Sequence, residues 1–262
     1  MTAPATADST PTAILERISL VLDAFDGPGR LTLAQVVRRT GLPRSSAHRM
    51  LERLVEMRWL RREGRDYELG TRLMELGSIA VHQNRLHSAA APILHDLHRA
   101  TGYVVHLGVV DGPDVLYLDK VGGRLATELP TRVGSRYPAR NSAIGKALLA
   151  YTPPSTDDLT ELTPELRKVR ETGVAYEVAR ISGGIGIIAV PIGPVGDVVA
   201  ALSICGPTSH VKFDHRHAAP VRMAANAIHR SLSGRPRAAQ VVPRAHHPGL
   251  SAATAQPRLQ YA

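Results

Sequence analysis

The stretch from Thr32 to Leu54 constrains this chain most, because it carries the signals of two short helices joined by a tight turn. Thr32 with Gln35 three residues later is the capping box of a helix start. Gly41 stands where that helix would end, and Pro43 stands where a second would begin. Two short helices that meet at a glycine turn predict a helix-turn-helix, a DNA-binding arrangement.

The predicted second helix has two different faces. Apolar residues recur at the spacing of a core-facing stripe, at Ala47, Met50, Leu51, Leu54 and Val55. The opposite face is polar and basic, so one face packs while the other can enter a groove of DNA.

We expect that polar face to contact DNA. Arg44 is the best candidate for contacting bases, because a guanidinium pairs with guanine, and three neighbours lie within reach of bases or backbone: Ser45, Ser46 and His48. Arg49 and Arg53 lie further along the helix, where exposure to solvent is an equal alternative. Four more arginines are predicted to hold phosphates: Arg38, Arg39, Arg62 and Arg65.

The segments on either side complete a winged helix-turn-helix. Trp59 to Leu69 contains two short apolar runs around a turn, which predicts a β-hairpin with basic residues at its tip. An earlier helix would start near Thr10 and Pro11, with one apolar face made of Leu15, Ile18, Leu22 and Phe25. Between Arg30 and Arg65, ten arginines face three acidic residues, a net charge of about +7.

Composition restricts the class of protein. A chain of 262 residues favours two modest domains, and its net charge of +9 favours an anionic partner. The single cysteine, Cys205, excludes an intramolecular disulfide framework and a Cys-rich zinc site, and no cofactor is expected. Because no apolar run approaches a membrane span and residues 1–10 are polar, we predict a cytoplasmic protein without membrane contact.

The second half alternates helices and strands, which predicts an α+β sheet domain. A linker helix from Thr71 to His82 carries Leu73, Leu76 and Ile79 at helical spacing and is expected to make the dimer contact. Further helices are expected over 92–100, 142–151 and 215–232, with one more that ends near residue 171. Strands are expected over 103–110, 115–121, 174–177, 185–192 and 198–204.

Over residues 12 to 232 the chain resembles the IclR family of transcriptional regulators. The resemblance rests on segments in a fixed order: 40–49, 67–73, 101–107, 117–121, 133–138, 143–150, 169–173 and 201–207. Between Leu149 and Val169 the chain is shorter than most relatives by roughly a helical hairpin.

The resemblance implies a winged helix-turn-helix, a linker helix and a GAF-like effector-binding domain, assembled as a homodimer or a dimer of dimers. It also implies a double-stranded DNA operator and a small organic or aromatic acid as effector, with repression favoured. The expected divisions are a disordered N-terminus over 1–11, the DNA-binding domain over 12–70, the linker over 71–84, the effector domain over 85–234 and a disordered basic tail over 235–262.

One helix start could hold the acid. Ser142 is a good N-cap, so the first amides of the helix, at Ala143, Ile144 and Gly145, are expected to be unpaired donors for a carboxylate. The alternative is an ordinary capped helix whose amides meet water.

The resemblance implies further effector contacts at Glu177, Ile187, Ser203 and Cys205. Relatives that bind a small oxo-acid have polar residues where this chain has Ile187. Because isoleucine adds apolar wall and removes a hydrogen-bond partner, we expect a larger or more hydrophobic acid than glyoxylate or pyruvate.

Two other classes of function compete with a regulator. A GAF-like enzyme would need a catalytic motif, but no phosphate loop, Gly-x-Ser-x-Gly elbow or His-Glu-x-x-His helix occurs. A non-specific architectural DNA-binding protein would not need the second half and would bind all sequences alike. The sequence therefore favours a ligand-responsive, sequence-specific regulator and not an enzyme.

Overall fold

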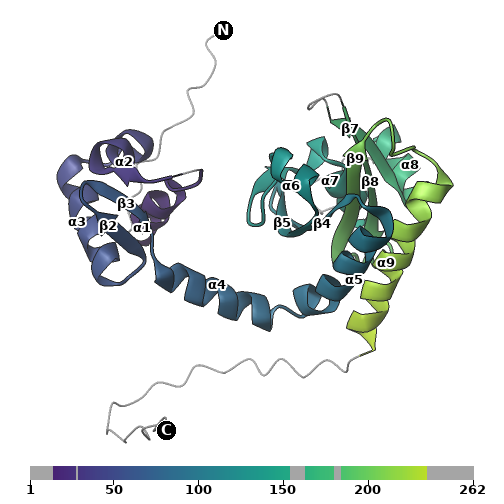
Figure 1. Ribbon diagram of the computed structural model, residues 1–262, viewed down its shortest axis with the longest axis horizontal. Coiled ribbons are helices and arrows are strands. Elements are labelled where there is room, and N and C mark those ends of the chain that lie inside the picture. The colour runs from purple at the N-terminus through teal and green to yellow at the C-terminus, as the bar shows by residue number, and fades with distance from the viewer. Residues whose placement is uncertain (1–13, 28, 154–162, 180–183, 235–262) are drawn as a thin grey trace, which may run out of the picture.

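The computed structural model describes residues 14–27, 29–153, 163–179 and 184–234. A single helix, α4 (Thr71–Gln83), joins an N-terminal part with three helices to a C-terminal part built on a larger sheet (Figure 1). The predicted fold class is confirmed: a winged helix-turn-helix, a linker helix and an α+β domain. The two predicted disordered ends lie outside the described residues.

The N-terminal part is a helix-turn-helix with a wing. Its elements are α1 (Ile14–Asp23), β1 (Leu31–Thr32), α2 (Leu33–Thr40), α3 (Arg44–Glu56), β2 (Leu60–Glu63) and β3 (Asp66–Leu69). The strands form an antiparallel sheet in the order β1-β3-β2, so the predicted hairpin is the wing.

The signals at the two ends of α2 act as predicted. The Gln35 amide donates to Thr32 Oγ1 at 3.3 Å, and the Thr32 amide donates to Gln35 Oε1 at 2.7 Å. Gly41 has a φ of +68°, where a side chain would be strained, and its amide donates to the carbonyl of Val37 at 2.9 Å. The left-handed residue ends α2 and turns the chain into α3.

The core of this domain confirms the apolar stripe of α3 and corrects that of α1. Ala47, Leu51 and Leu54 are buried in one cluster with Val21 and Phe25. The prediction for Leu15 was wrong: it is 74% exposed, because it lies in the first turn of α1, beyond the stretch around Val21 that packs on the core. The predicted start at Thr10 and Pro11 lies outside the described residues.

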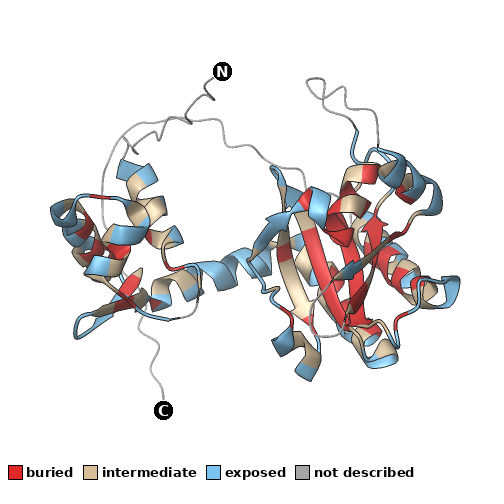
Figure 2. Cartoon of the chain, turned by 90° about the horizontal axis from the view of Figure 1, so that it is seen from above, coloured by how far each residue is buried: buried red, intermediate tan, exposed pale blue. Residues whose placement is uncertain are grey.

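The C-terminal part is a six-stranded antiparallel sheet in the order β6-β5-β4-β9-β8-β7. Its elements are α5 (Arg85–Thr101), β4 (Val104–Asp111), β5 (Asp114–Val121), α6 (Arg124–Glu128), β6 (Arg136–Pro138), the 3-10 turn η1 (Ala139–Asn141), α7 (Ala143–Tyr151), α8 (Pro164–Thr172), β7 (Ala175–Ala179), β8 (Ile185–Ile192), β9 (Ala200–Pro207) and α9 (His215–Ser233). The strands at the middle of the sheet are largely buried (Figure 2), and helices on both faces complete the core.

The two faces of this sheet differ in the residues that they present. On β9, Leu202 and Ile204 join the cluster under α5 and α9. The residues between and after them, Ser203 and Cys205, point to the opposite face, where α7 packs. Strand alternation therefore separates a structural face from a second face that contains polar residues.

Helix α5 begins earlier than predicted. It starts at Arg85 instead of Pro92, because Asn84 Oδ1 caps it by accepting the His87 amide at 3.0 Å. Pro92 lies inside this helix. In α4 none of the residues is buried, and Leu76 and Ile79 are exposed.

Candidate DNA interface and effector cavity

The first turns of α3 present the residues that were predicted to contact DNA bases. The helix begins at Arg44, directly after Pro43. Arg44, Ser45 and His48 are exposed, and Ser46 is half-buried. These side chains occupy the face opposite the buried stripe, as a helix that enters a groove requires.

Ion pairs neutralise half of the ten arginines between positions 30 and 65. On and beside α3, Arg53 pairs with Glu56 at 2.6 Å, and Arg62 of the wing pairs with Glu52 at 3.0 Å. Arg58 pairs with Glu75 of α4. Each of these ion pairs has a net charge near zero, so its guanidinium attracts a distant anion only weakly.

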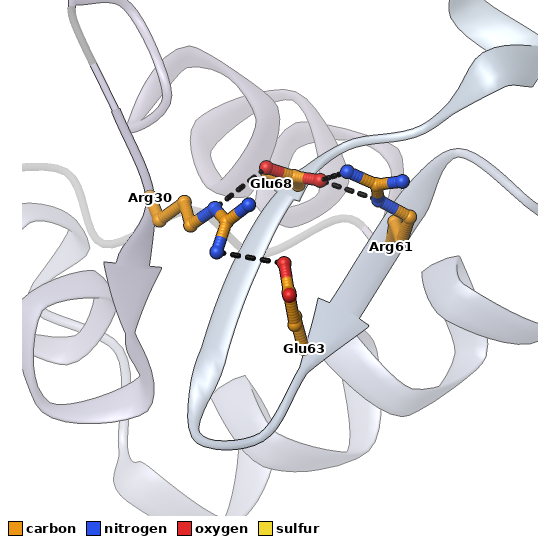
Figure 3. A network of polar contacts seen from close by, with 4 residues as sticks. All are labelled: Arg30, Arg61, Glu63 and Glu68. Carbon is orange, nitrogen blue, oxygen red and sulfur yellow. Dashed lines mark hydrogen bonds and ion pairs between the residues drawn. The ribbon is translucent and has the colours of Figure 1, made fainter.

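Figure 3 shows the network of ion pairs that holds the other two paired arginines, Arg30 and Arg61. Arg30 reaches Glu63 at 2.7 Å and Glu68 at 2.9 Å, and Arg61 also binds Glu68. Arg61 first, and then Arg30, hold the pKa of the Glu68 carboxyl below its usual range. The network ties the segment that leads into β1 to both strands of the wing.

The remaining five arginines have no carboxylate partner within the described part of the chain. They are Arg38, Arg39, Arg44, Arg49 and Arg65. All five are exposed and all were predicted to contact DNA. Arg62, which was predicted to hold phosphate, is paired instead, and so is Arg53, for which solvent exposure was the equal alternative. Sequence analysis missed the partner of Arg62, Glu52, which also accepts the Tyr67 hydroxyl at 2.9 Å.

A cavity of about 950 Å³ lies on the α7 side of the large sheet. All six residues predicted for the effector line it: Ala143, Ile144, Glu177, Ile187, Ser203 and Cys205. Its outer wall includes Leu22, Phe25 and Leu69 from the DNA-binding domain. The structure thus brings together residues that lie more than 60 positions apart in the chain.

His106 of β4 is a deeply buried polar side chain of the cavity, with 2% exposure, equal to that of Ser203. Its Nε2 lies 2.8 Å from Thr131 Oγ1 and its Nδ1 lies 3.5 Å from Cys205 Sγ. Burial, with a smaller contribution from the Lys120 charge, lowers the pKa of His106 to about 3. The imidazole is therefore neutral at pH 7. Sequence analysis missed it, although a histidine inside an apolar strand was a visible signal.

The other deep polar groups are neutral as well. Burial raises the pKa of the Cys205 thiol to about 12 and also raises the pKa of the Tyr117 hydroxyl. The Tyr117 ring meets His106 edge-on, with 5.4 Å between centroids. This wall can exchange hydrogen bonds with a ligand without placing a charge beside it.

The start of α7 corrects one expectation. The Gly145 amide is not unpaired, because it donates to Ser142 Oγ at 3.0 Å, and the backbone of Ala143 hydrogen-bonds the Glu177 carboxyl. A side chain at Gly145 would place its Cβ 2.0 Å from the carbonyl oxygen of Ala139. The first turn of α7 is therefore held tightly against η1.

Glu177 is the acidic residue on the sheet side of the cavity, where Asp23 and Asp26 of the DNA-binding domain also line it. Burial raises the pKa of its carboxyl, and Lys146, whose Nζ lies 3.9 Å away, partly opposes that shift. Lys146 is closer to Glu165 of α8, at 2.8 Å. Glu177 Oε2 is buried without a hydrogen-bond partner among the described residues.

Two kinds of feature are absent from the described residues: a cluster of metal ligands and a membrane-spanning helix. No group of three or more His, Cys, Asp or Glu side chains there could hold a metal ion. No helix there has the length and apolar character to cross a membrane.

Comparison with known proteins identifies both halves of the chain. Residues 14–64 match the IclR helix-turn-helix domain, and residues 78–158 and 152–230 match the bacterial transcriptional regulator IclR C-terminal domain. The transcriptional regulator XynR of Escherichia coli is 30% identical over 219 residues, which cover 75% of this chain and 87% of XynR. The regulator KdgR of Dickeya chrysanthemi is 27% identical over 218 residues, 75% of this chain and 72% of KdgR.

Solved structures show the same fold. The crystal structure of an IclR homolog from Microbacterium hydrocarbonoxydans in complex with 4-hydroxybenzoate is similar with a TM-score of 0.73 and 28% identity. That match covers 85% of this chain and all of the other. With an exposed helix-turn-helix and a ligand-sized cavity in one polypeptide, this chain belongs to the IclR family of transcriptional regulators.

Proposed function

We propose that the protein is a site-specific repressor whose operator affinity is changed by an organic or aromatic acid in the cavity. The observation that carries this proposal is the meeting of all six predicted effector residues on one cavity wall. The five arginines without a carboxylate partner among the described residues support the DNA half, because guanidiniums that are not neutralised within the protein can attract phosphates and pair with guanine. Arg39 also donates to the carbonyl of Ala24 at 2.6 Å, which leaves its charge in place. Repression is favoured by the family resemblance.

The cavity chemistry supports an acid with an apolar body. Ile144 and Ile187 supply apolar wall, while the first turn of α7 presents the positive end of a helix dipole. His106 is neutral, so one of its ring nitrogens donates a hydrogen bond and the other accepts one. Because burial raises the pKa of Glu177, a nearby ligand carboxylate meets an acid that takes up a proton more readily than an exposed glutamate.

DNA titration tests the regulator. The protein is titrated into labelled DNA from upstream of its own gene and into a scrambled duplex of equal length, at two salt concentrations. A site-specific regulator prefers the native duplex by ~10³-fold or more. Equal and steeply salt-dependent binding to both duplexes would contradict the proposal and favour an architectural protein.

The acid is tested on the same DNA. Addition of 4-hydroxybenzoate, and of a series of smaller and larger carboxylates, should shift the titration curve for at least one apolar acid. Glyoxylate and pyruvate are the matched small acids and should shift it less, because Ile187 replaces a polar contact. A shift by the small acids alone would contradict the proposed effector class.

A further inference from the structure

A loop over residues 129–135, called here the cavity loop, lines the cavity and is held by hydrogen bonds to β4 and β5. The Gly134 amide donates to the carbonyl of Tyr117 at 2.8 Å. Lys120 Nζ donates to the carbonyls of Leu129 and Thr131 at 3.1 and 2.5 Å. The Tyr117 amide donates to the carbonyl of Ser135 at 3.1 Å, so with the bond between Thr131 and His106 five hydrogen bonds from β4 and β5 set the position of this loop.

The tip of the cavity loop reaches the DNA-binding domain. Arg132 Nη2 lies 2.6 Å from Asp26 Oδ1, in the turn that follows α1. The Arg132 amide donates to Ser135 Oγ at 3.1 Å, which keeps the tip compact. Leu22 at the end of α1 and Phe25 in the turn line the same cavity as the loop. One continuous set of contacts therefore leads from His106 to the DNA-binding domain.

A ligand that hydrogen-bonds to His106 must replace an existing partner, because both ring nitrogens are occupied. Nδ1 faces the Cys205 thiol at 3.5 Å, and Nε2 faces the Thr131 hydroxyl at 2.8 Å. Cys205 is fixed in β9, whereas Thr131 belongs to a loop without regular secondary structure. Displacement of Thr131 is the smaller rearrangement.

We propose that the cavity loop is a docking surface for the DNA-binding domain of the same chain, and that an acid bound at His106 loosens this docking by displacing Thr131. This inference rests on the proposed function, since it needs an effector in the cavity. The Arg132–Asp26 pair is more than half exposed, so it contributes weakly, and a small shift of the loop suffices to break it. The effector can bias the docking by no more than its differential affinity for the two states.

Hydrogen exchange on the ligand-free, full-length protein tests the docking. Arg132→Glu and Asp26→Arg should each speed amide exchange in residues 22–27 and 129–135, and the double charge swap should restore slow exchange. Arg124→Glu is the matched control, because it makes the same charge change on α6, where the partner Glu128 belongs to the same domain. Identical exchange in the wild type and both single swaps would overturn the docking.

The coupling is tested with 4-hydroxybenzoate as the probe, on the upstream DNA described above. We expect the probe-induced change in DNA affinity to fall at least threefold in each single swap, to return in the double swap and to persist in Arg124→Glu. Thr131→Val replaces the hydroxyl with a methyl group. This variant should speed amide exchange in residues 129–135 without the probe. A full probe response in the single swaps would overturn the coupling. If the probe leaves wild-type DNA binding unchanged, the proposed effector class fails, while exchange still decides the docking.

Discussion

The two surfaces proposed here for DNA and for the effector differ in how they hold charge. On the proposed DNA face, five exposed arginines have no carboxylate partner among the residues that the structure describes, and a separate network neutralises Arg30 and Arg61. In the cavity, His106, Tyr117 and Cys205 are buried and held neutral. The first surface exposes charged side chains to water, whereas the deep wall of the cavity around His106 carries polar groups that are neutral.

The difference follows from what each surface has to bind. A DNA backbone is a dense row of fixed charges, so unpaired guanidiniums gain affinity by releasing its counterions. A single buried acid would be costly to place beside a fixed charge of the same sign, and neutral dipoles recognise its shape and hydrogen bonds instead. Changes of charge should therefore matter on the DNA face, and changes of volume or packing should matter in the cavity.

The largest expected effect concerns packing at the cavity. Gly145→Ala would force a methyl group against the backbone of Ala139, so the free energy of unfolding should fall by about 3 kcal/mol, the upper range for overpacking. Gly77→Ala in α4 is the matched control, since its Cβ meets open space and alanine favours a helix by ~1 kcal/mol. Urea unfolding measures both, and equal stability of the two variants would break the contrast.

A second test uses pH to ask whether the cavity is neutral. The folded pKa of His106 is about 3 and the unfolded value is about 6.5, so the unfolded chain binds more protons between them. Stability from this group is complete above pH 6.5 and is lost as the pH falls, by about 1.4 kcal/mol per pH unit. Unfolding of His106→Gln between pH 6.5 and 4.5 should lack this component, and equal pH slopes in the two proteins would contradict a buried neutral imidazole.

Charge removal on the DNA face comes next. Arg44→Ala should weaken operator binding by about 1–3 kcal/mol and relax sequence preference, because an unpaired guanidinium at the start of α3 is lost. Arg53→Ala on the same helix is the control, since Arg53 is already paired with Glu56. Competition titrations with specific and random duplexes measure the effect. Equal losses on both duplexes would show that Arg44 holds only phosphate.

A smaller effect tests volume in the cavity. Ile187→Ser restores a polar wall on β8 and should shift the affinity ratio between 4-hydroxybenzoate and glyoxylate about tenfold toward glyoxylate. Isothermal titration of both acids measures the ratio. Val178, exposed on the neighbouring strand β7, provides the control substitution Val178→Ser, which should leave the ratio unchanged. An unchanged ratio in Ile187→Ser would remove this residue from the proposed site.

The smallest effect separates paired from unpaired charge within the wing. Arg65→Ala should weaken binding to all DNA sequences alike and reduce the salt slope by about 1. Arg61→Ala removes the same charge from a residue that Glu68 already neutralises, so its salt slope should change less. A larger change for Arg61→Ala would contradict the division of the arginines into paired and unpaired sets.

Periodic segments were predictable from sequence, and contacts between distant segments were not. The stripe of α3, the β4–β5 hairpin and the bounds of β8 follow from apolar spacing and turn residues. Strand β1 and helix α6 were missed because two and five residues are too short to show a period. Which arginines are paired was also beyond the sequence, since Arg30 meets Glu68 only after the sheet has formed.

The cavity shows the same limit. A resemblance to relatives placed six of its residues, but His106 depends on Thr131 and Cys205, which are 25 and 99 positions away. Sequence alone does not distinguish a histidine that lines a cavity from one that is paired inside an ordinary core, because both can lie in an apolar strand. Only the register of β4 with β9, which sets His106 opposite Ser203, identifies the wall to which it belongs.

The alternation along β9 has a consequence for how such regulators diverge. Leu202 and Ile204 anchor the face under α5 and α9, while Ser203 and Cys205 belong to the ligand wall. Mutations at every second position can therefore change ligand chemistry while the anchoring positions keep the fold. In this part of β9, even-numbered positions stabilise the fold and odd-numbered positions line the proposed ligand site. Substitutions at the odd-numbered positions can therefore alter ligand preference while the fold is kept.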